Sequence, residues 1–331
     1  MTIKINFCDF WPGFKDNNLF LKFFEKYFDI SIVENPDFLI FSVYGNTHLK
    51  YKDSIKIFFT GENIVPDFNL CDYAIGYHYL EFGDRYMRFP LYVYYQWYYS
   101  YLGYGIDQGN KVNMVKEEGL LRRKFCNFLY SNRVHADPIR DRFFNEISKY
   151  KRVDSGGRHL NNVGKPVNNK MHFIKDYKFT IAFENSCVPG YTTEKLLEPI
   201  LINSLPIYYG NPLVHLDFNI NSFIRVKNTH DIDRAIDEII FLDQNDDSYL
   251  ERQNQPKFVN DNSLEMWEEK LLVFFNNIFK QGLLSAKRKP EYGFSRYYCE
   301  NLGLKASLLD KHRSWNSIKA GVKHLIMGKN D

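Results

Sequence analysis

The residues with the clearest capacity for chemistry lie between residues 179 and 212, in the segment FTIAFENSCVPGYTTEKLLEPILINSLPIYYGNP. A buried strand is predicted to end just before Glu184 and Asn185, and a loop that contains glycine and proline follows. A helix is then predicted to begin at Thr192 or Thr193, because either side chain can act as its N-cap. Ligands of open α/β sheets bind beyond the carboxyl ends of the strands, so this loop is a candidate ligand site.

The charges at the start of that helix point to an anion. Lys195 lies in the first turn, where a cation opposes the helix dipole, whereas the free N–H groups of the same turn attract anions. The position of Lys195 is therefore easiest to explain if a bound diphosphate offsets the unfavourable charge. Alternatively, Glu194 is a carboxylate favoured by the dipole and Lys195 is a solvated surface charge.

Several segments resemble the motifs of glycosyltransferase family 10, the α-1,3/α-1,4-fucosyltransferases, and the similarity is closest to the bacterial lipopolysaccharide enzymes. The donor-binding signature of the family is similar to residues 183–185, 191–196 and 205–210. Further similar segments are residues 60–63, 84–91, 131–140 and 153–157. They occur in the family's order over about residues 55–250, so chance is a poor explanation.

The resemblance implies that Glu62 is the catalytic base. It follows a predicted strand at residues 55–61 and would face a cleft between two domains. Its carboxylate can take the proton of the acceptor hydroxyl as that oxygen attacks the anomeric carbon of fucose, which is typically worth about 10²–10⁴ in rate. From spacing alone, Glu62 is equally a glutamate on a surface turn.

The resemblance also places Arg140, Tyr191 and Lys195 against the diphosphate of the donor. Departure of GDP leaves negative charge on the β-phosphate, which arginine binds through two hydrogen bonds and lysine binds as a point charge. Removal of one such donor typically costs about 3–4 kcal/mol in transition-state stabilisation. Without the resemblance, Arg140 would be a solvated residue on an amphipathic helix.

Glu194 and Asn185 align with positions near the donor sugar and the ribose. Glu194 would either stabilise the positively charged fucosyl centre, as a second catalytic residue beside Glu62, or bind hydroxyl groups. Gly156 and Gly157 either let the backbone approach the nucleotide or form a plain turn.

No cofactor or resident metal is predicted. The histidines lack ligand spacing and no acidic pair is a convincing D-x-D motif, so Arg140 and Lys195 are expected to replace a metal cation, with stimulation by Mn²⁺ left open. The five cysteines are scattered and form no CxxC pair, which favours free thiols over a disulfide framework or a zinc site.

Strands alternate with helices in two blocks, which predicts an α/β protein with two doubly wound sheets. This agrees with the GT-B fold of the family, in which two Rossmann-like domains face each other across a cleft. The predicted parts are an acceptor-binding domain, a GDP-fucose-binding domain and a helical tail, at residues 1–115, 116–290 and 291–331. A polar segment at residues 103–124 is the candidate connection between the domains.

The composition is that of a globular protein, and a net charge of +3 is too small to indicate nucleic-acid binding. The first residues do not resemble a secretory signal and no apolar stretch is long enough to span a bilayer, so a cytoplasmic location is expected. Residues 263–281 and 305–327 predict amphipathic helices. The second is basic, and it either lies on the inner face of a bacterial cytoplasmic membrane or packs against the enzyme body.

Together these features predict an inverting fucosyltransferase. It would transfer L-fucose from GDP-fucose to an N-acetylglucosamine hydroxyl of a lactosamine-type glycan, in α-1,3 or α-1,4 linkage, as in the Lewis antigens of lipopolysaccharide. Two alternatives are a GT-B transferase that uses another sugar nucleotide and a catalytically silent glycan-binding protein of the same fold. The joint presence of Glu62, Arg140, Tyr191, Glu194 and Lys195 argues against the silent protein.

Overall fold

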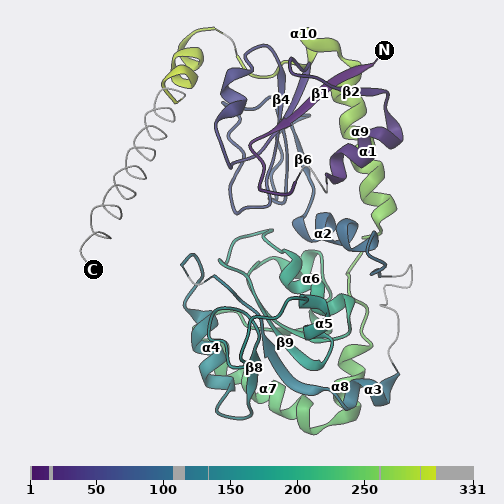
Figure 1. Ribbon diagram of the computed structural model, residues 1–331, viewed down its shortest axis with the longest axis vertical. Coiled ribbons are helices and arrows are strands. Elements are labelled where there is room, and N and C mark those ends of the chain that lie inside the picture. The colour runs from purple at the N-terminus through teal and green to yellow at the C-terminus, as the bar shows by residue number, and fades with distance from the viewer. Residues whose placement is uncertain are drawn as a thin grey trace, which may run out of the picture. The chain divides into compact units, whose positions relative to one another are not determined.

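The computed structural model describes residues 2–14, 18–106, 116–132, 134–260, 262–290 and 292–302. Its contacts divide the chain into two compact units, shown as ribbons in Figure 1. Unit 1 comprises the described residues of Met1–Gly76, Glu81–Met87 and Leu272–Asp331, and unit 2 comprises those of Tyr77–Leu80 and Arg88–Leu271. The predicted boundaries after residues 115 and 290 do not coincide with this division.

The described part of unit 1 is built on a six-stranded sheet in the order β2-β1-β3-β4-β5-β6. The strands are β1 (Ile3–Cys8), β2 (Ile30–Ile32), β3 (Phe38–Phe41), β4 (Ile55–Phe59), β5 (Tyr73–Gly76) and β6 (Tyr86–Arg88). The first five pair in parallel, and β3 and β4 are buried along their whole length, as their apolar runs predict. The chain runs from β1 to β2 on one side and returns to β3 on the other, which opens a crevice at the carboxyl ends of β1 and β3.

Aromatic side chains join the first helix of unit 1 to the last long helix. The helix α1 (Leu19–Tyr27) begins where the side chain of Asn18 accepts a hydrogen bond from the N–H of Leu21, at 3.0 Å. Its buried face meets α9 (Leu264–Lys280), with the rings of Phe24 and Phe275 edge to face at 4.7 Å. These contacts explain why the chain from Leu272 onward belongs to unit 1. The other described helical segments of this unit are η2 (Thr47–Lys50), α10 (Gly282–Ala286) and residues 294–302.

Unit 2 has, in its described residues, a five-stranded parallel sheet in the order β11-β10-β9-β7-β8. Its strands are β7 (Lys124–Phe128), β8 (Val153–Ser155), β9 (Tyr177–Phe183), β10 (Leu205–Tyr209) and β11 (Ile224–Arg225). The chain leaves β7 for β8 on one side and then crosses to β9 on the other. A second crevice therefore opens at the carboxyl ends of β7 and β9.

Helices cover both faces of this sheet. One face carries α5 (Lys170–Ile174) and α6 (Glu194–Leu201), and the other carries α4 (Ile139–Ile147), α7 (Ile232–Gln244) and α8 (Asp246–Gln253) (Figure 1). The remaining helices of unit 2 are α2 (Leu91–Ser100), α3 (Glu117–Leu121), η3 (Val214–Leu216), η4 (Ile220–Ser222) and η5 (Thr229–Asp231). Pro199 lies inside α6, which ends two residues later at Leu201, in agreement with the early end that an interior proline predicts.

Some predicted elements are confirmed, and others lie outside the described residues. The helix predicted at residues 263–281 is confirmed as α9. The basic amphipathic segment at residues 305–327 and much of the candidate connection, residues 107–115, lie outside the described residues. None of the described helices is both long and apolar enough to cross a membrane.

Candidate active site

Most of the predicted site residues gather at the crevice of unit 2. The loop after β7 leads to Arg140 in the first turn of α4, and the loop after β9 carries Asn185 and ends at the start of α6. Because β7 and β9 are neighbouring parallel strands, their loops leave the same edge of the sheet. The structure thus brings together segments that are about 45 residues apart in the chain.

A completely buried carboxylate organises the start of α6. Glu184, with no exposed surface, accepts hydrogen bonds from the backbone N–H of Thr193 at 2.7 Å and from its hydroxyl at 2.8 and 3.0 Å. The side chain of Thr193 in turn accepts from the N–H of Lys195 at 3.4 Å and caps the helix. Burial raises the pKa of Glu184, and the neighbouring charge of Lys195 opposes that effect.

Lys195 lies between two carboxylates. Its Nζ is 3.4 Å from Oε2 of Glu184 and 3.1 Å from Oε1 of Glu194. Although burial disfavours the charge of Lys195, Glu194 and Glu184 raise its pKa well above the usual value. Burial likewise acts against ionisation of Glu194, but Lys195 and Lys170 lower the pKa of Glu194 to about 2. The unfavourable position of Lys195 on the helix dipole is therefore already offset by carboxylates, and Lys195 is not a solvated surface charge.

Arg140 is a buried cation without a carboxylate partner. Only 1% of its surface is exposed, and among the described residues no carboxylate lies within ion-pair distance of it. Its guanidinium stacks on the ring of Tyr130 at 4.1 Å and donates to the carbonyl of Asn132 at 2.6 Å and to Oδ1 of Asn185 at 3.4 Å. Its Nε has no hydrogen-bond partner in the described chain, and burial lowers its pKa. Such a group is disposed to bind an anion, and the alternative of a solvated helix residue is excluded.

The other donor-side predictions occupy the same edge with different surroundings. Tyr191 is 4% exposed, and its ring lies 5.3 Å from that of Tyr77. The carbonyl of Asn185 accepts from the N–H of Asp137 at 2.9 Å, which ties the loop after β9 to the loop after β7. Tyr191 is thus buried, whereas Asn185 is half-buried and is fixed through its backbone carbonyl.

The glycines after β8 are explained by close contact with protein atoms. A Cβ on Gly157 would lie 1.9 Å from the carbonyl oxygen of Tyr130, and one on Gly156 would lie 2.8 Å from the ring of Phe173. Only glycine therefore fits at residue 157, whether or not a nucleotide also approaches the turn.

Glu62 belongs to unit 1, whereas all the other predicted site residues belong to unit 2. It follows β4 in an exposed turn, where its backbone N–H donates to the hydroxyl of Thr60 at 3.2 Å. One carboxylate oxygen accepts a hydrogen bond from the hydroxyl of Tyr44. The predicted cleft that would bring Glu62 to the donor stays a prediction.

The residues that support α6 carry no distinctive signal in the sequence. Glu198, one turn after Glu194, is buried, and its carboxylate contacts both Nζ of Lys170 and the hydroxyl of Tyr99. Tyr99 comes from α2, an element that the sequence analysis missed because its aromatic run LYVYYQWYYS lacks helical periodicity. Glu184 was visible as a glutamate directly after a buried strand, but its pairing with Lys195 was not.

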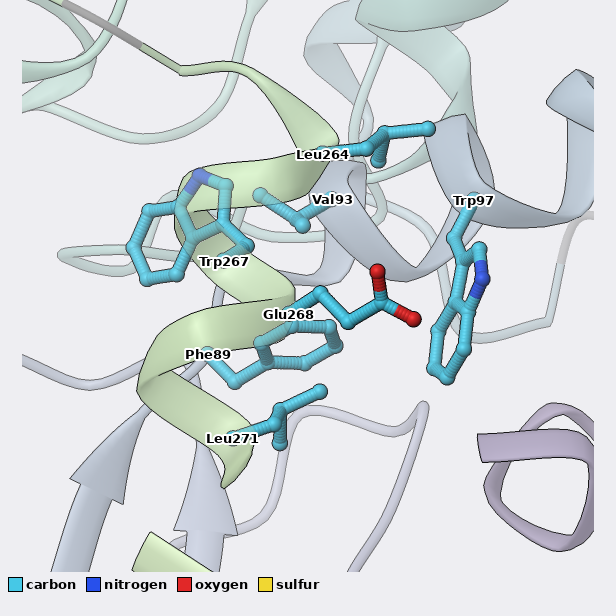
Figure 2. A pocket seen from close by; sticks show the side chains of 7 residues that line it. All are labelled: Phe89, Val93, Trp97, Leu264, Trp267, Glu268 and Leu271. Carbon is cyan, nitrogen blue, oxygen red and sulfur yellow. The ribbon is translucent and has the colours of Figure 1, made fainter. Parts of the chain in front are cut away.

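A small hollow elsewhere in unit 2 does not fit a sugar nucleotide. Figure 2 shows it between α2 and α9, with the carboxylate of Glu268 pointing toward the indole of Trp97. Its volume is about 30 Å³, which has room for no more than a few water molecules. The lining residues are Phe89, Val93, Trp97, Leu264, Trp267, Glu268 and Leu271. Within the described residues, no group of three or more histidine, cysteine, aspartate or glutamate side chains is arranged to hold a metal ion.

Comparison with known proteins decides the family. A family model of the alpha-(1,3)-fucosyltransferase FucT N-terminal domain matches residues 5–95, and one of the glycosyltransferase family 10 (fucosyltransferase) C-terminal domain matches residues 121–277. The chain belongs to glycosyltransferase family 10. It is 31% identical to the alpha-(1,3)-fucosyltransferase FucT of Helicobacter pylori, over 84% of this chain and 66% of that relative. It thus spans just under two thirds of that relative and smaller shares of the next ones.

Solved structures of alpha1,3-fucosyltransferases agree with this assignment. A crystal structure of an alpha1,3-fucosyltransferase matches with a TM-score of 0.72 and 28% identity, over 84% of this chain and 90% of the other. A crystal structure of an alpha1,3-fucosyltransferase with GDP-fucose matches with a TM-score of 0.66 and 29% identity, over 83% and 90%. With two parallel α/β sheets and these neighbours, the predicted α/β GT-B fold class is confirmed.

Proposed function

We propose that this family 10 chain is an inverting fucosyltransferase that uses GDP-fucose as donor. The observation that carries the proposal is Arg140, a buried guanidinium without a carboxylate partner, at the same sheet edge as Lys195. Burying an unpaired cation is costly unless a ligand supplies the opposite charge. A diphosphate is the anion of matching chemistry, because its oxygens accept hydrogen bonds from arginine and lysine.

The proposed donor half of the reaction uses these two cations. Arg140 and Lys195 hold the diphosphate and stabilise the negative charge that grows on the β-phosphate as its bond to C1 of fucose breaks. Glu194, already paired with Lys195, lies near the fucosyl group and stabilises its positive charge or binds its hydroxyls. Asn185, Tyr191 and Gly156 complete the donor-binding set.

In the acceptor half, Glu62 is the proposed general base. An acceptor hydroxyl oxygen attacks C1 of fucose from the face opposite to GDP, its proton passes to the Glu62 carboxylate, and GDP leaves, so the configuration at C1 inverts. The exposed turn that holds Glu62 leaves its carboxylate accessible to a sugar. The two cations supply the positive charge that a metal provides in other transferases, so no metal is required in this scheme.

The proposed acceptor is an N-acetylglucosamine hydroxyl in a lactosamine-type glycan, fucosylated in α-1,3 or α-1,4 linkage. Support comes from the Helicobacter pylori relative, which is an alpha-(1,3)-fucosyltransferase. The nearest alternative is a transferase of the same fold with another sugar nucleotide as donor.

The test is transfer of fucose from GDP-fucose to N-acetyllactosamine and to its type 1 isomer, with GDP-mannose and a UDP-sugar as donor controls. Product with GDP-fucose alone, with inverted anomeric configuration by NMR, is expected. Slow hydrolysis of GDP-fucose without transfer would support GDP-fucose as the donor and contradict the proposed acceptor. If the protein neither binds nor turns over GDP-fucose but does turn over another donor, the alternative is favoured.

A further inference from the structure

Glu62 has a neighbour that the proposed function leaves unused. Tyr44 lies in the loop after β3, at the crevice where the loops after β1 and β3 leave the sheet of unit 1. Its hydroxyl donates to Oε1 of Glu62, although 18 residues separate the two. Its ring lies edge to face with the indole of Trp11 at 6.2 Å.

The loop that carries Tyr44 is held by Asp9, directly after β1. The side chain of Asp9 is 3% exposed, and its carboxylate accepts from the N–H of Thr47 at 3.0 Å, from the N–H of His48 at 2.9 Å and from Nδ1 of His48 at 2.7 Å. The carbonyl of Asp9 accepts from the N–H of Tyr44 at 2.9 Å. One residue therefore fixes the loop on both sides of the Tyr44 side chain.

The backbone of Asp9, which supports this loop, is in a strained conformation. Asp9 has a positive φ of 58°, which is unfavourable for residues other than glycine. A Cβ on Gly45 would lie 2.4 Å from Oδ1 of Asp9, so residue 45 must be glycine while Asp9 keeps its place. Backbone strain that persists at a ligand-binding edge of a sheet is typical of a device that positions functional groups.

Tyr44 is suited to donate its proton in a hydrogen bond and to keep it. Burial and the hydrogen bond to Glu62 raise the pKa of the phenol above its usual value. The side chain is nevertheless 48% exposed, so it meets solvent or a ligand at the same surface as Glu62. Glu62 is the titratable side chain that Tyr44 hydrogen-bonds in the described chain, while Asp9 meets Tyr44 through its backbone carbonyl and His48 contacts Asp9.

We propose that Tyr44 is a positioning residue for Glu62, braced by Asp9 and His48. The phenol holds one carboxylate oxygen, which leaves the other oxygen free to take the proton of the acceptor hydroxyl. The proposal rests on the proposed role of Glu62 as the base. It adds a residue that acts through that base without contact with the reacting atoms.

The test compares Tyr44→Phe, which removes only the hydroxyl, with the matched variant Tyr150→Phe. Tyr150 also donates to a carboxylate, Oδ2 of Asp243 at 3.1 Å, but on unit 2 away from the predicted site residues. In the free full-length protein, the ¹³C-carboxyl chemical shift of Glu62 is measured at pH 7. This chemical shift is expected to change in Tyr44→Phe, which loses the hydrogen bond to Glu62, and to stay in place in Tyr150→Phe.

Kinetics give the second readout. Tyr44→Phe is expected to lower kcat about tenfold and to leave the KM for GDP-fucose within about twofold. Gly45→Ala, which displaces Asp9 while retaining Tyr44 and Glu62, is expected to lower kcat in the same way.

The outcomes separate this proposal from the proposed function. An unchanged ¹³C-carboxyl chemical shift of Glu62 in Tyr44→Phe would overturn the positioning role, even in an enzyme that transfers fucose. Wild-type protein that transfers no fucose would overturn the proposed function, while a changed chemical shift of Glu62 in Tyr44→Phe would still establish the contact. A tenfold loss in kcat with Tyr150→Phe as well would show a general effect of lost hydroxyls and would also overturn the positioning role.

Discussion

The crevices of unit 1 and unit 2 lie at the same kind of sheet edge, but the charged side chains in them differ in burial. In unit 2, Glu184 is completely buried and Lys195 is held between two carboxylates. In unit 1, the carboxylate of Glu62 lies in an exposed turn and contacts a single described side chain, Tyr44. Both edges lie at the carboxyl ends of parallel strands where the strand order reverses.

The difference follows from the charge that each edge would handle. A doubly charged leaving group is best stabilised by fixed charges in a site with little water, where electrostatic interactions are strong. A general base must instead receive a neutral hydroxyl and later release its proton, which favours an accessible carboxylate. Substitutions on the two sides should therefore differ in their effect on stability as well as in their effect on activity.

The largest expected effect on activity comes from substitution of the exposed carboxylate in unit 1. Glu62→Ala should lower kcat for fucose transfer by about 10²–10⁴-fold, because the acceptor proton loses its base. Tm and the thermal protection by GDP should not change, because Glu62 is exposed and lies in the other unit from Arg140. The matched control is Glu34→Ala, another exposed glutamate of unit 1, and equal activity in the two variants would remove Glu62 from the mechanism.

In unit 2, Lys195→Ala should lower both the activity and the thermal stability. Activity should fall by about 10²–10³-fold because the leaving group loses a cation, and Tm should also fall because Glu184 and Glu194 lose their partner. The double variant Lys195→Ala/Glu184→Gln should recover part of the Tm without activity. Lys149→Ala, which removes an exposed ion pair with Glu146, is the control, and recovery of activity in the double variant would contradict the donor role.

A smaller effect is expected from the turn beside the donor crevice. Gly157→Ala places a methyl group 1.9 Å from the carbonyl oxygen of Tyr130 and should cost about 1–3 kcal/mol in the free energy of unfolding. Gly105→Ala is the control, because a Cβ there meets nothing within 4 Å. Thermal and urea unfolding measure the stability of the two variants. Equal stability would show that the turn accommodates the methyl group without loss of folding free energy.

The smallest expected effect concerns pH and the support of Tyr44. Hydrogen bonds from His48 and Thr47 outweigh burial and lower the pKa of Asp9. The folded pKa lies below the unfolded value of about 3.9, so this stabilisation is present above about pH 4 and is lost as pH falls below it. Asp9→Asn should lower the free energy of unfolding by about 2 kcal/mol at pH 7 and by less at pH 3. Urea unfolding at both pH values tests this, and an equal loss at the two would be inconsistent with a charge effect.

Several parts of the fold were open to prediction from local pattern. The buried runs at β4 and β9 and the amphipathic run at α9 were assigned correctly, because their periodicity depends only on neighbouring residues. The apolar run FLIFSVYG predicts a strand over residues 38–45, which is longer than the observed β3. The chain leaves the sheet after Phe41, where contacts with the segment after β1 replace the strand pairing, and Tyr44 lies in the resulting loop.

The sequence by itself determined the two α/β blocks, the loops at the strand ends and the residue types that those loops present. The tertiary structure alone decided which of these residues meet: Glu184 with Lys195, Arg140 with Asn185, and Tyr44 with Glu62. Such pairs are up to 45 residues apart, and their contact depends on strand order and on the loop geometry that follows from it. Periodicity reports the burial of a residue on its own element, whereas the charge and proton affinity of a site depend on partners from other elements.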